Sequence, residues 1–136
     1  MTLEDLGYNE YLENYRNDQG FGSFGVGRVS LEHKERYTVK TEENEYDAEI
    51  IGNLRFTANT RSDFPAVGDW VAFSEFDEKK VLIHSDFPRK TIIERQAVGK
   101  QGEKQIIATN IDFAFIVQSV DYDFNINRLE RYLTIC

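Results

Sequence analysis

The sequence predicts a mainly β protein whose central element is a five-stranded barrel over residues 25–85. Two observations lead to this prediction. β-Branched and aromatic residues recur in short alternating runs, as half-buried strands require, and turn-forming stretches separate the runs. Five short antiparallel strands favour a partly open Greek-key barrel of the OB type or an SH3-like barrel, because closure removes exposed sheet edges.

The strands are expected at residues 25–32, 36–41, 45–54, 70–76 and 80–85. Their turns are expected at Lys34-Glu35, Glu42 to Asn44, Asn59 to Pro65 and Asp77 to Lys79. Trp70 is the only tryptophan and directly follows Gly68-Asp69. We therefore predict that Trp70 anchors the floor of the barrel.

Residues 1–24 are predicted to form a short amphipathic helix over the first sixteen residues, followed by a glycine-rich lead-in. Thr2 and Asp5 form an approximate capping box. The apolar face of the helix would contain Leu3, Leu6, Tyr11, Leu12 and Tyr15. Residues 20–25 match GxGxxG, but a helix precedes them and a β-run follows, whereas a dinucleotide fingerprint needs the opposite order. We interpret these glycines as a flexible entry to the first strand.

The pattern changes after the barrel. Pro88 cannot donate a hydrogen bond to a sheet, and residues 86–105 are predicted to form a linker. The continuous apolar run from Ile111 to Val117 is typical of a strand covered on both faces in a parallel sheet, and Asn125 is a candidate cap for a final helix. One strand and one helix cannot bury both faces of the strand, so residues 106–136 are expected to begin a second, incomplete α/β domain.

Composition excludes several classes of protein. No apolar run is long enough to span a bilayer, and the amino terminus carries acids where a signal peptide would carry bases. The single cysteine, Cys136, rules out a disulfide framework and a thiolate metal site. We expect a soluble, cytoplasmic chain with no membrane partner.

No catalytic, cofactor-binding or metal-binding residue is expected in this chain. His33 and His84 lack partners at metal-ligand spacing. The sequence contains no GxSxG elbow, and Cys136 has no sequence context of a nucleophile.

The net charge of -8 is unusual for a nucleic-acid binder, although bases exceed acids locally. Residues 86–104 hold the bases Arg89, Lys90, Arg95, Lys100 and Lys104 against the acids Asp86, Glu94 and Glu103. A local basic patch can bind phosphate within an acidic chain, because salt screens distant carboxylates over about 8–10 Å. The alternative is that these are ordinary solvated charges.

Three stretches carry a family resemblance: PAVGDWVAF, DFPRKTIIERQAVGK and KQIIATNIDFAFIVQSVDYDFNINRLERYL. In this order they resemble the amino-terminal portion of the RsgA (YjeQ-type) circularly permuted GTPases, which act in assembly of the small ribosomal subunit. The resemblance covers about residues 25–136. It implies an OB-fold barrel that contacts ribosomal RNA (rRNA), then a permuted GTPase domain and a small zinc-binding domain. It also implies GTP hydrolysis that the small subunit stimulates.

In that family, the guanine-reading Asn-Lys-x-Asp motif, the phosphate loop, the magnesium-binding switch and the zinc ligands all follow the segment present here. GTP, magnesium and zinc are therefore implied for a full-length parent and not for this chain. Phosphoryl transfer depends on positioned phosphates and magnesium, so we expect this chain to be inactive as a GTPase. The implied partners are the small ribosomal subunit with its rRNA and the remainder of the GTPase domain.

OB barrels bind nucleic acid on one sheet face and on the loops joining strands 1 to 2 and 4 to 5. The RNA-binding candidates are Arg28, Lys34, Arg36, Lys79, Lys80, Arg89, Lys90 and Arg95. The last three could instead hold the barrel against the GTPase domain. The alternative function is a free-standing OB-type protein-interaction module with no nucleic-acid role, whose binding would be indifferent to salt and to these lysines.

Overall fold

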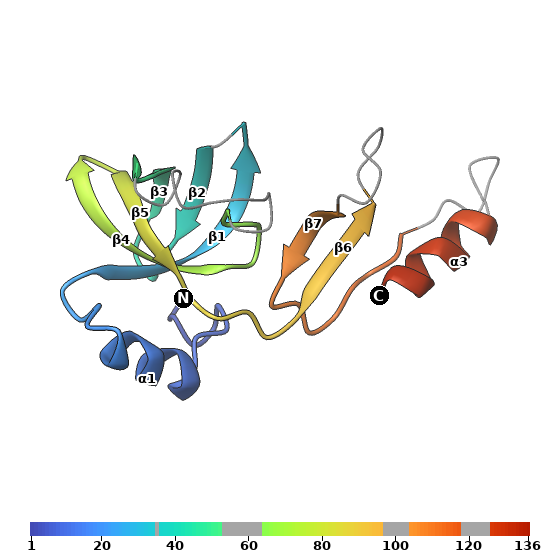
Figure 1. Cartoon of the computed structure of the whole chain (residues 1–136), viewed down its shortest axis with the longest axis horizontal. Coiled ribbons are helices and arrows are strands. Elements are labelled where there is room, and N and C mark those ends of the chain that lie inside the picture. Colours follow the sequence, from blue (N-terminus) through green and yellow to red (C-terminus); the bar gives the residue numbers. More distant parts are fainter. Residues whose placement is uncertain (35, 53–63, 97–103, 118–125) are drawn as a thin grey trace.

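A computed structural model of the chain describes residues 1–34, 36–52, 64–96, 104–117 and 126–136. A closed barrel forms one part of the molecule, a helix lies below it, and a separate two-stranded sheet lies between the barrel and the last helix (Figure 1). The elements are α1 (Glu10–Asp18), β1 (Gly25–His33), β2 (Arg36–Lys40), β3 (Glu45–Ile50), β4 (Trp70–Asp77), β5 (Lys80–Asp86), β6 (Ile92–Gln96), β7 (Lys104–Thr109) and α3 (Ile126–Ile135).

The barrel has the strand order β1-β2-β3-β5-β4, and β4 closes it by pairing with β1. β3 and β5 pair in parallel, whereas the other neighbours are antiparallel. The prediction of an entirely antiparallel barrel was therefore wrong for this pair. The connection from Ile50 to Trp70 is long enough for β4 to pair with β1. The edge of β3 is then free to pair with β5. This order is that of an OB-type barrel, so the predicted mainly β fold class is confirmed.

The predicted strand boundaries agree closely with the structure. Four of the five strands begin and end within one residue of the predicted positions. The third strand begins at Glu45 as predicted but ends at Ile50. The predicted turn from Asn59 to Pro65 falls largely outside the described residues.

Two apolar clusters share strand β4. Val71 and Phe73 point into the barrel, and Trp70 and Ala72 point the other way, as alternation along a strand requires. The barrel core contains Val29, Tyr37, Val39, Ala48, Ile50, Val71, Phe73, Val81 and Ile83. The second cluster, below the barrel, contains Leu12, Val26, Trp70, Ala72 and Phe87. Trp70 is 2% exposed. It is buried in the cluster below the barrel and not in the barrel core, so its place differs from the predicted anchor at the barrel floor.

The amino-terminal segment forms a turn before its helix. Thr2 N–H donates to Asp5 Oδ2 (2.9 Å) and Asp5 N–H donates to Thr2 Oγ1 (3.1 Å), as predicted for a capping box. These hydrogen bonds lower the pKa of Asp5. Gly7, at φ +107°, then reverses the chain, and α1 begins only after Asn9, whose side chain accepts from Leu12 N–H (3.0 Å). The prediction of a helix over all of the first sixteen residues was therefore wrong.

Most of the predicted apolar face of this segment does pack on the second cluster. The packed members are Leu3, Leu6, Leu12 and Tyr15. Tyr11 is the exception, because it is 65% exposed.

The carboxy-terminal part differs from the prediction. The described residues from Asn110 to Val117 contain no strand, so the predicted strand at 111–117 was wrong. β6 and β7 instead pair upstream as an antiparallel hairpin, and β6 lies within the stretch 86–105 for which the sequence predicts a linker. Helix α3 forms where a helix was predicted, but Asn125, its predicted cap, lies outside the described residues. No helix in the described part of the chain is long and apolar enough to cross a membrane.

Candidate nucleic-acid interface

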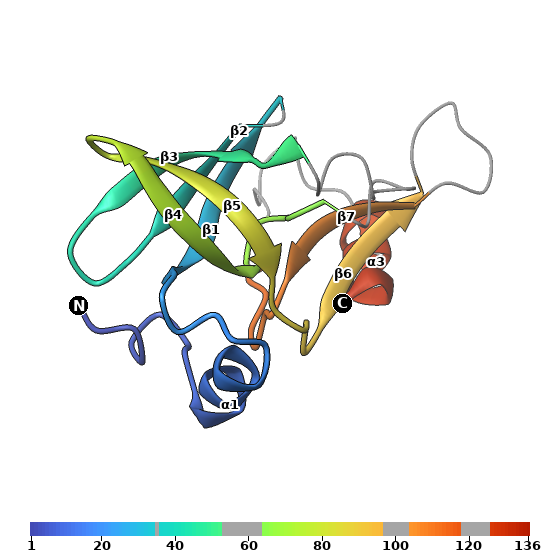
Figure 2. The same ribbon diagram turned by 60° about the vertical axis from the view of Figure 1, so that its left-hand side comes forward.

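Four of the eight predicted RNA-binding residues lie at one end of the barrel, which we call the hairpin end: Lys34, Arg36, Lys79 and Lys80. The β1–β2 and β4–β5 turns are both at this end, away from α1 (Figures 1 and 2). β3 lies between the two hairpins, because Arg36 pairs in register with Glu49 and Lys80 pairs with Asp47.

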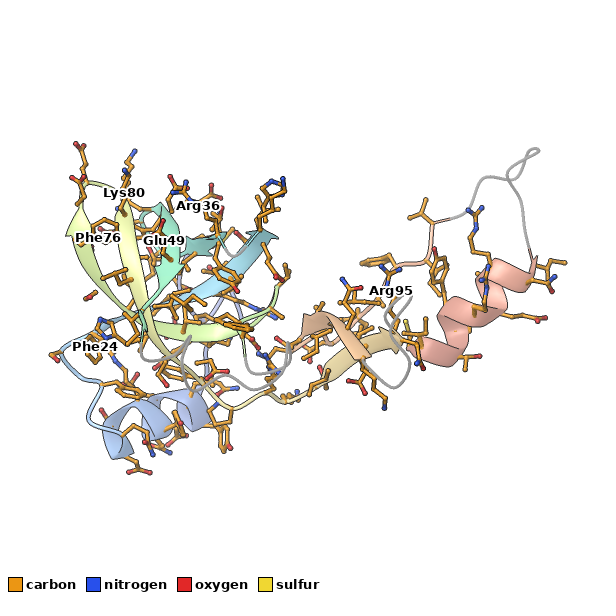
Figure 3. All side chains as sticks on the ribbon, turned by 45° about the horizontal axis from the view of Figure 1, so that its top comes forward. Phe24, Arg36, Glu49, Phe76, Lys80 and Arg95 are labelled. Atoms are coloured by element: carbon orange, nitrogen blue, oxygen red, sulfur yellow. The ribbon has the colours of Figure 1, made fainter. Side chains whose placement is uncertain are left out.

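An exposed phenylalanine accompanies these cations. Figure 3 shows Phe76 with Lys80, Arg36 and Glu49 at the hairpin end, and together with Asp47 they line a hollow of about 190 Å³. Phe76 is 53% exposed, and the strand register shifts between Glu75 and Asp77. Sequence reasoning did not select Phe76, although an aromatic residue among charged neighbours beside a turn was an available signal.

The hairpin end carries both signs of charge. Arg36 Nη2 lies 3.1 Å from Glu49 Oε1, with the two side chains 77% and 48% exposed. Asp77 and Glu78 lie in the same turn as Lys79. Exposed ion pairs of this kind contribute about 0–1 kcal/mol, so the cations are loosely held and accessible to a ligand. Contacts with phosphate at this end would be weakened by salt.

Arg89 has internal partners. Asp69, which is fully buried, accepts from Arg89 Nε (2.9 Å) and Arg89 Nη2 (2.8 Å). It also accepts from Ala66 N–H (2.8 Å) and from the Thr109 hydroxyl. We call Asp69, Arg89 and Thr109 the junction, because they connect the turn before β4, the chain after β5 and the end of β7.

Gly68 shows how closely the segments of the junction approach one another. Its φ is +99°, and a Cβ atom at this position would lie 2.0 Å from the carbonyl oxygen of Thr109. Thr109 N–H also donates to Val67 O (2.8 Å). The β6–β7 hairpin is therefore fixed to the barrel by buried polar contacts.

Arg28 joins the same region from the side of β1. Its guanidinium donates to the carbonyl oxygens of Leu6 (2.6 Å), Gly68 (3.0 Å) and Asn110 (2.7 Å), and it lies 6.0 Å from the centre of the Trp70 ring. Burial lowers the pKa of Arg28. The side chain thus connects the amino-terminal segment, the barrel and the residue after β7.

The structure brings Arg28, Arg89 and Lys90 together around one hollow of about 460 Å³ between α1 and the junction. We call it the waist hollow. Tyr11, Trp70 and Asp112 also line it, and Lys90 Nζ lies 3.4 Å from Asp112 Oδ1. Sequence spacing could not reveal this site, because its residues come from five separate segments.

Arg95 lies apart from both groups. It is exposed on β6 and pairs in register with Gln105 (Figure 3). Sequence order alone had placed it beside Arg89 and Lys90.

The histidines have different surroundings. His33 is exposed next to Lys34, whereas His84 Nε2 lies 2.7 Å from Ser74 Oγ and its ring stacks on Phe24 at 4.4 Å. No group of three or more histidine, cysteine or acidic residues that could hold a metal ion is found among the described residues.

Comparison with known proteins gives consistent matches, although no family model matches the chain. The small ribosomal subunit biogenesis GTPase RsgA of Opitutus terrae is 36% identical over 144 aligned positions, covering 99% of this chain and 39% of the relative. RsgA 1 of Listeria innocua is 41% identical over 136 positions, covering 99% and 36%. RsgA 2 of Lactiplantibacillus plantarum is 44% identical over 110 positions, covering 81% and 31%.

A solved structure supports the fold. The crystal structure of YloQ, described as a circularly permuted GTPase, matches 82% of this chain and 36% of its own chain, with a TM-score of 0.52 and 20% identity. The chain thus spans less than two-fifths of the length of these relatives.

Proposed function

Because this chain is homologous to the RsgA (YjeQ-type) family of ribosome biogenesis GTPases over nearly its whole length, we propose that it docks such a protein on the small ribosomal subunit and its rRNA. The observation that carries the proposal is the OB-type barrel of an RsgA homologue, with Lys34, Arg36, Lys79 and Lys80 at its hairpin end. OB barrels bind nucleic acid through these loops by backbone charge and base stacking. Phe76, exposed in the same place, suits a stacked base.

The proposal extends to the longer parent protein. Residues 106–136 would begin its GTPase domain, and the remainder of that domain would cover Phe113, Phe115 and Val117, which are 85–92% exposed. GTP, magnesium and zinc would bind to parts of the parent beyond those present here, in the cytoplasm. The 136-residue chain should show no GTP turnover above background. Turnover well above background from the purified chain would contradict this expectation.

Co-sedimentation with purified small ribosomal subunits tests the docking role. We expect reversal of all four cations, Lys34, Arg36, Lys79 and Lys80 to Glu, to reduce bound chain by at least about tenfold at low salt, because several phosphate contacts are lost together. The double reversals of Lys34 with Arg36 and of Lys79 with Lys80 should each give part of the effect.

The control is the double reversal of Lys104 and Arg131, which are exposed cations outside the barrel. It changes the net charge by the same amount as either double reversal. Equal co-sedimentation of the fourfold variant and the unaltered chain would refute the docking proposal.

The mixed charge at the hairpin end favours one alternative, an OB-type protein-interaction module. Asp77 and Glu78 share the turn with Lys79 and would repel phosphate, whereas a protein partner could bind the exposed apolar ring of Phe76. Such binding would persist as salt is raised and would tolerate the lysine reversals. RNA docking would weaken steeply with salt.

A further inference from the structure

The waist hollow is large enough for a small ligand. Its volume of about 460 Å³ falls within the range of about 300–1,000 Å³ typical of ligand sites. Trp70, 2% exposed, forms its apolar floor, and Leu12 lies beside it. The hollow adjoins α1, so it is at the opposite end of the barrel from the hairpin end (Figure 2).

The charges around the waist hollow favour an anion. Arg28, Arg89 and Lys90 line it, against one lining carboxylate, Asp112. Asp69 neutralises much of the Arg89 charge, which leaves Arg28 and Lys90 as the cations that face a ligand. The Lys90 side chain is 75% exposed, and its Nζ lies 3.4 Å from Asp112 Oδ1.

Arg28 is preorganised. Its hydrogen bonds to Leu6 O, Gly68 O and Asn110 O hold the guanidinium in place. A guanidinium has five N–H donors, so further donors remain for a ligand. Because the group is fixed before binding, little side-chain entropy is lost when a ligand arrives.

Tyr11 adds an aromatic surface. It is 65% exposed and lines the same hollow. Its neighbour Leu12 is 5% exposed, so the helix backbone that carries Tyr11 is anchored to the barrel. An exposed aromatic ring beside cations is the combination on which single-stranded nucleic acids stack.

We propose that the waist hollow receives one unpaired nucleotide of a single-stranded RNA, with its base against Tyr11 and its phosphate between Lys90 and Arg28. This inference rests on the proposed docking function and adds a second contact at the other end of the barrel. An acidic peptide would use the same cations but would gain nothing from the aromatic ring.

The test is fluorescence anisotropy of a labelled decaadenylate titrated with the full 136-residue chain at low salt. Lys90→Glu should weaken binding about tenfold. Lys104→Glu is its matched control, because Lys104 is 68% exposed and lies 3.3 Å from Glu94. It should change affinity less than about twofold, since Lys104 lies outside the hollow.

Tyr11→Ala should also weaken binding about tenfold, which is typical of removing one stacking ring. Its matched control is Tyr132→Ala, a 44% exposed tyrosine on α3. All four positions are exposed, and circular dichroism melts that match the unaltered chain would establish that each variant is folded.

The outcomes separate this inference from the docking function. If Lys90→Glu and Tyr11→Ala bind like their controls while reversal of Lys79 and Lys80 weakens binding, the nucleotide site is refuted and the docking function stands. If no variant affects binding, the nucleotide site is refuted, and co-sedimentation with small subunits decides the docking function separately. If decaglutamate displaces the RNA at similar concentration and Tyr11→Ala is neutral, the hollow is a peptide site and the inference fails.

Discussion

The barrel and the segment after β7 contain similar apolar residues but bury them to opposite degrees. Val81 and Ile83 on β5 are fully buried, whereas Phe113 and Phe115 are 85% and 92% exposed. The barrel strands satisfy their backbone groups through neighbours on both sides, and the described residues 110–117 form no strand. The comparison teaches that an apolar run becomes a strand only where a neighbouring strand pairs with it.

The largest expected effect comes from the junction that fixes the β6–β7 hairpin to the barrel. Asp69→Ala should lower the free energy of unfolding by about 3–5 kcal/mol, because it leaves the guanidinium of Arg89, whose side chain is 13% exposed, without its buried carboxylate partner. Urea denaturation measures the change. Asp112→Ala is the control, since that exposed carboxylate pairs with Lys90 at the surface, and its cost should stay below about 1 kcal/mol. An equal decrease in the free energy of unfolding for the two variants would show that the junction contributes no more to stability than a surface ion pair.

The next largest effect compares a buried apolar residue of the barrel with an exposed one in the segment after β7. Ile83→Ala should cost about 2–5 kcal/mol, because it removes buried methyl groups and leaves a cavity in the barrel core. Phe115→Ala removes a larger side chain but should change the free energy of unfolding by no more than about 0.5 kcal/mol. Chemical denaturation of both variants provides the measurement. A cost above 2 kcal/mol for Phe115→Ala would mean that the segment after β7 is packed in solution.

The barrel was predictable from sequence because its signals are local. Alternation and turn chemistry act over a few residues, and they located β1, β2, β4 and β5 to within one residue. The parallel pairing of β3 with β5 was not predictable in this way, because it depends on where a long connection delivers β4. The run from Ile111 to Val117 misled because a continuous apolar stretch does not by itself specify a strand.

The candidate sites were predictable only in part, since residue type does not reveal a partner distant in sequence. Arg89 was selected as a cation, but its partner Asp69 lies 20 residues before it. Thr109, whose hydroxyl donates to the same carboxylate, lies 40 residues after Asp69. Arg28 was selected in the same way, and its carbonyl partners come from three segments. The exposure of Tyr11 was missed because helical spacing assigned it to the buried face.

The smallest expected effect tests whether the packing of the amino-terminal segment on the barrel contributes to the free energy of unfolding. The Tyr8 ring packs against Trp70 at 5.1 Å, and its hydroxyl donates to Glu13 Oε2. Burial, and then this hydrogen bond, raise the pKa of Tyr8 above its ordinary value. The neutral phenol therefore contributes stability that is fully present below about pH 10, the pKa of an unfolded tyrosine, and is lost as the pH rises towards the higher folded value.

Tyr8→Phe should cost about 1 kcal/mol at pH 7, and the difference between the two chains in urea denaturation should narrow above about pH 10. Tyr132→Phe on α3 should leave the neutral-pH stability within about 0.5 kcal/mol of the unaltered chain. If Tyr8→Phe also changes the stability by less than about 0.5 kcal/mol, the amino-terminal segment is as loosely attached as the segment after β7. The folded unit would then begin at β1.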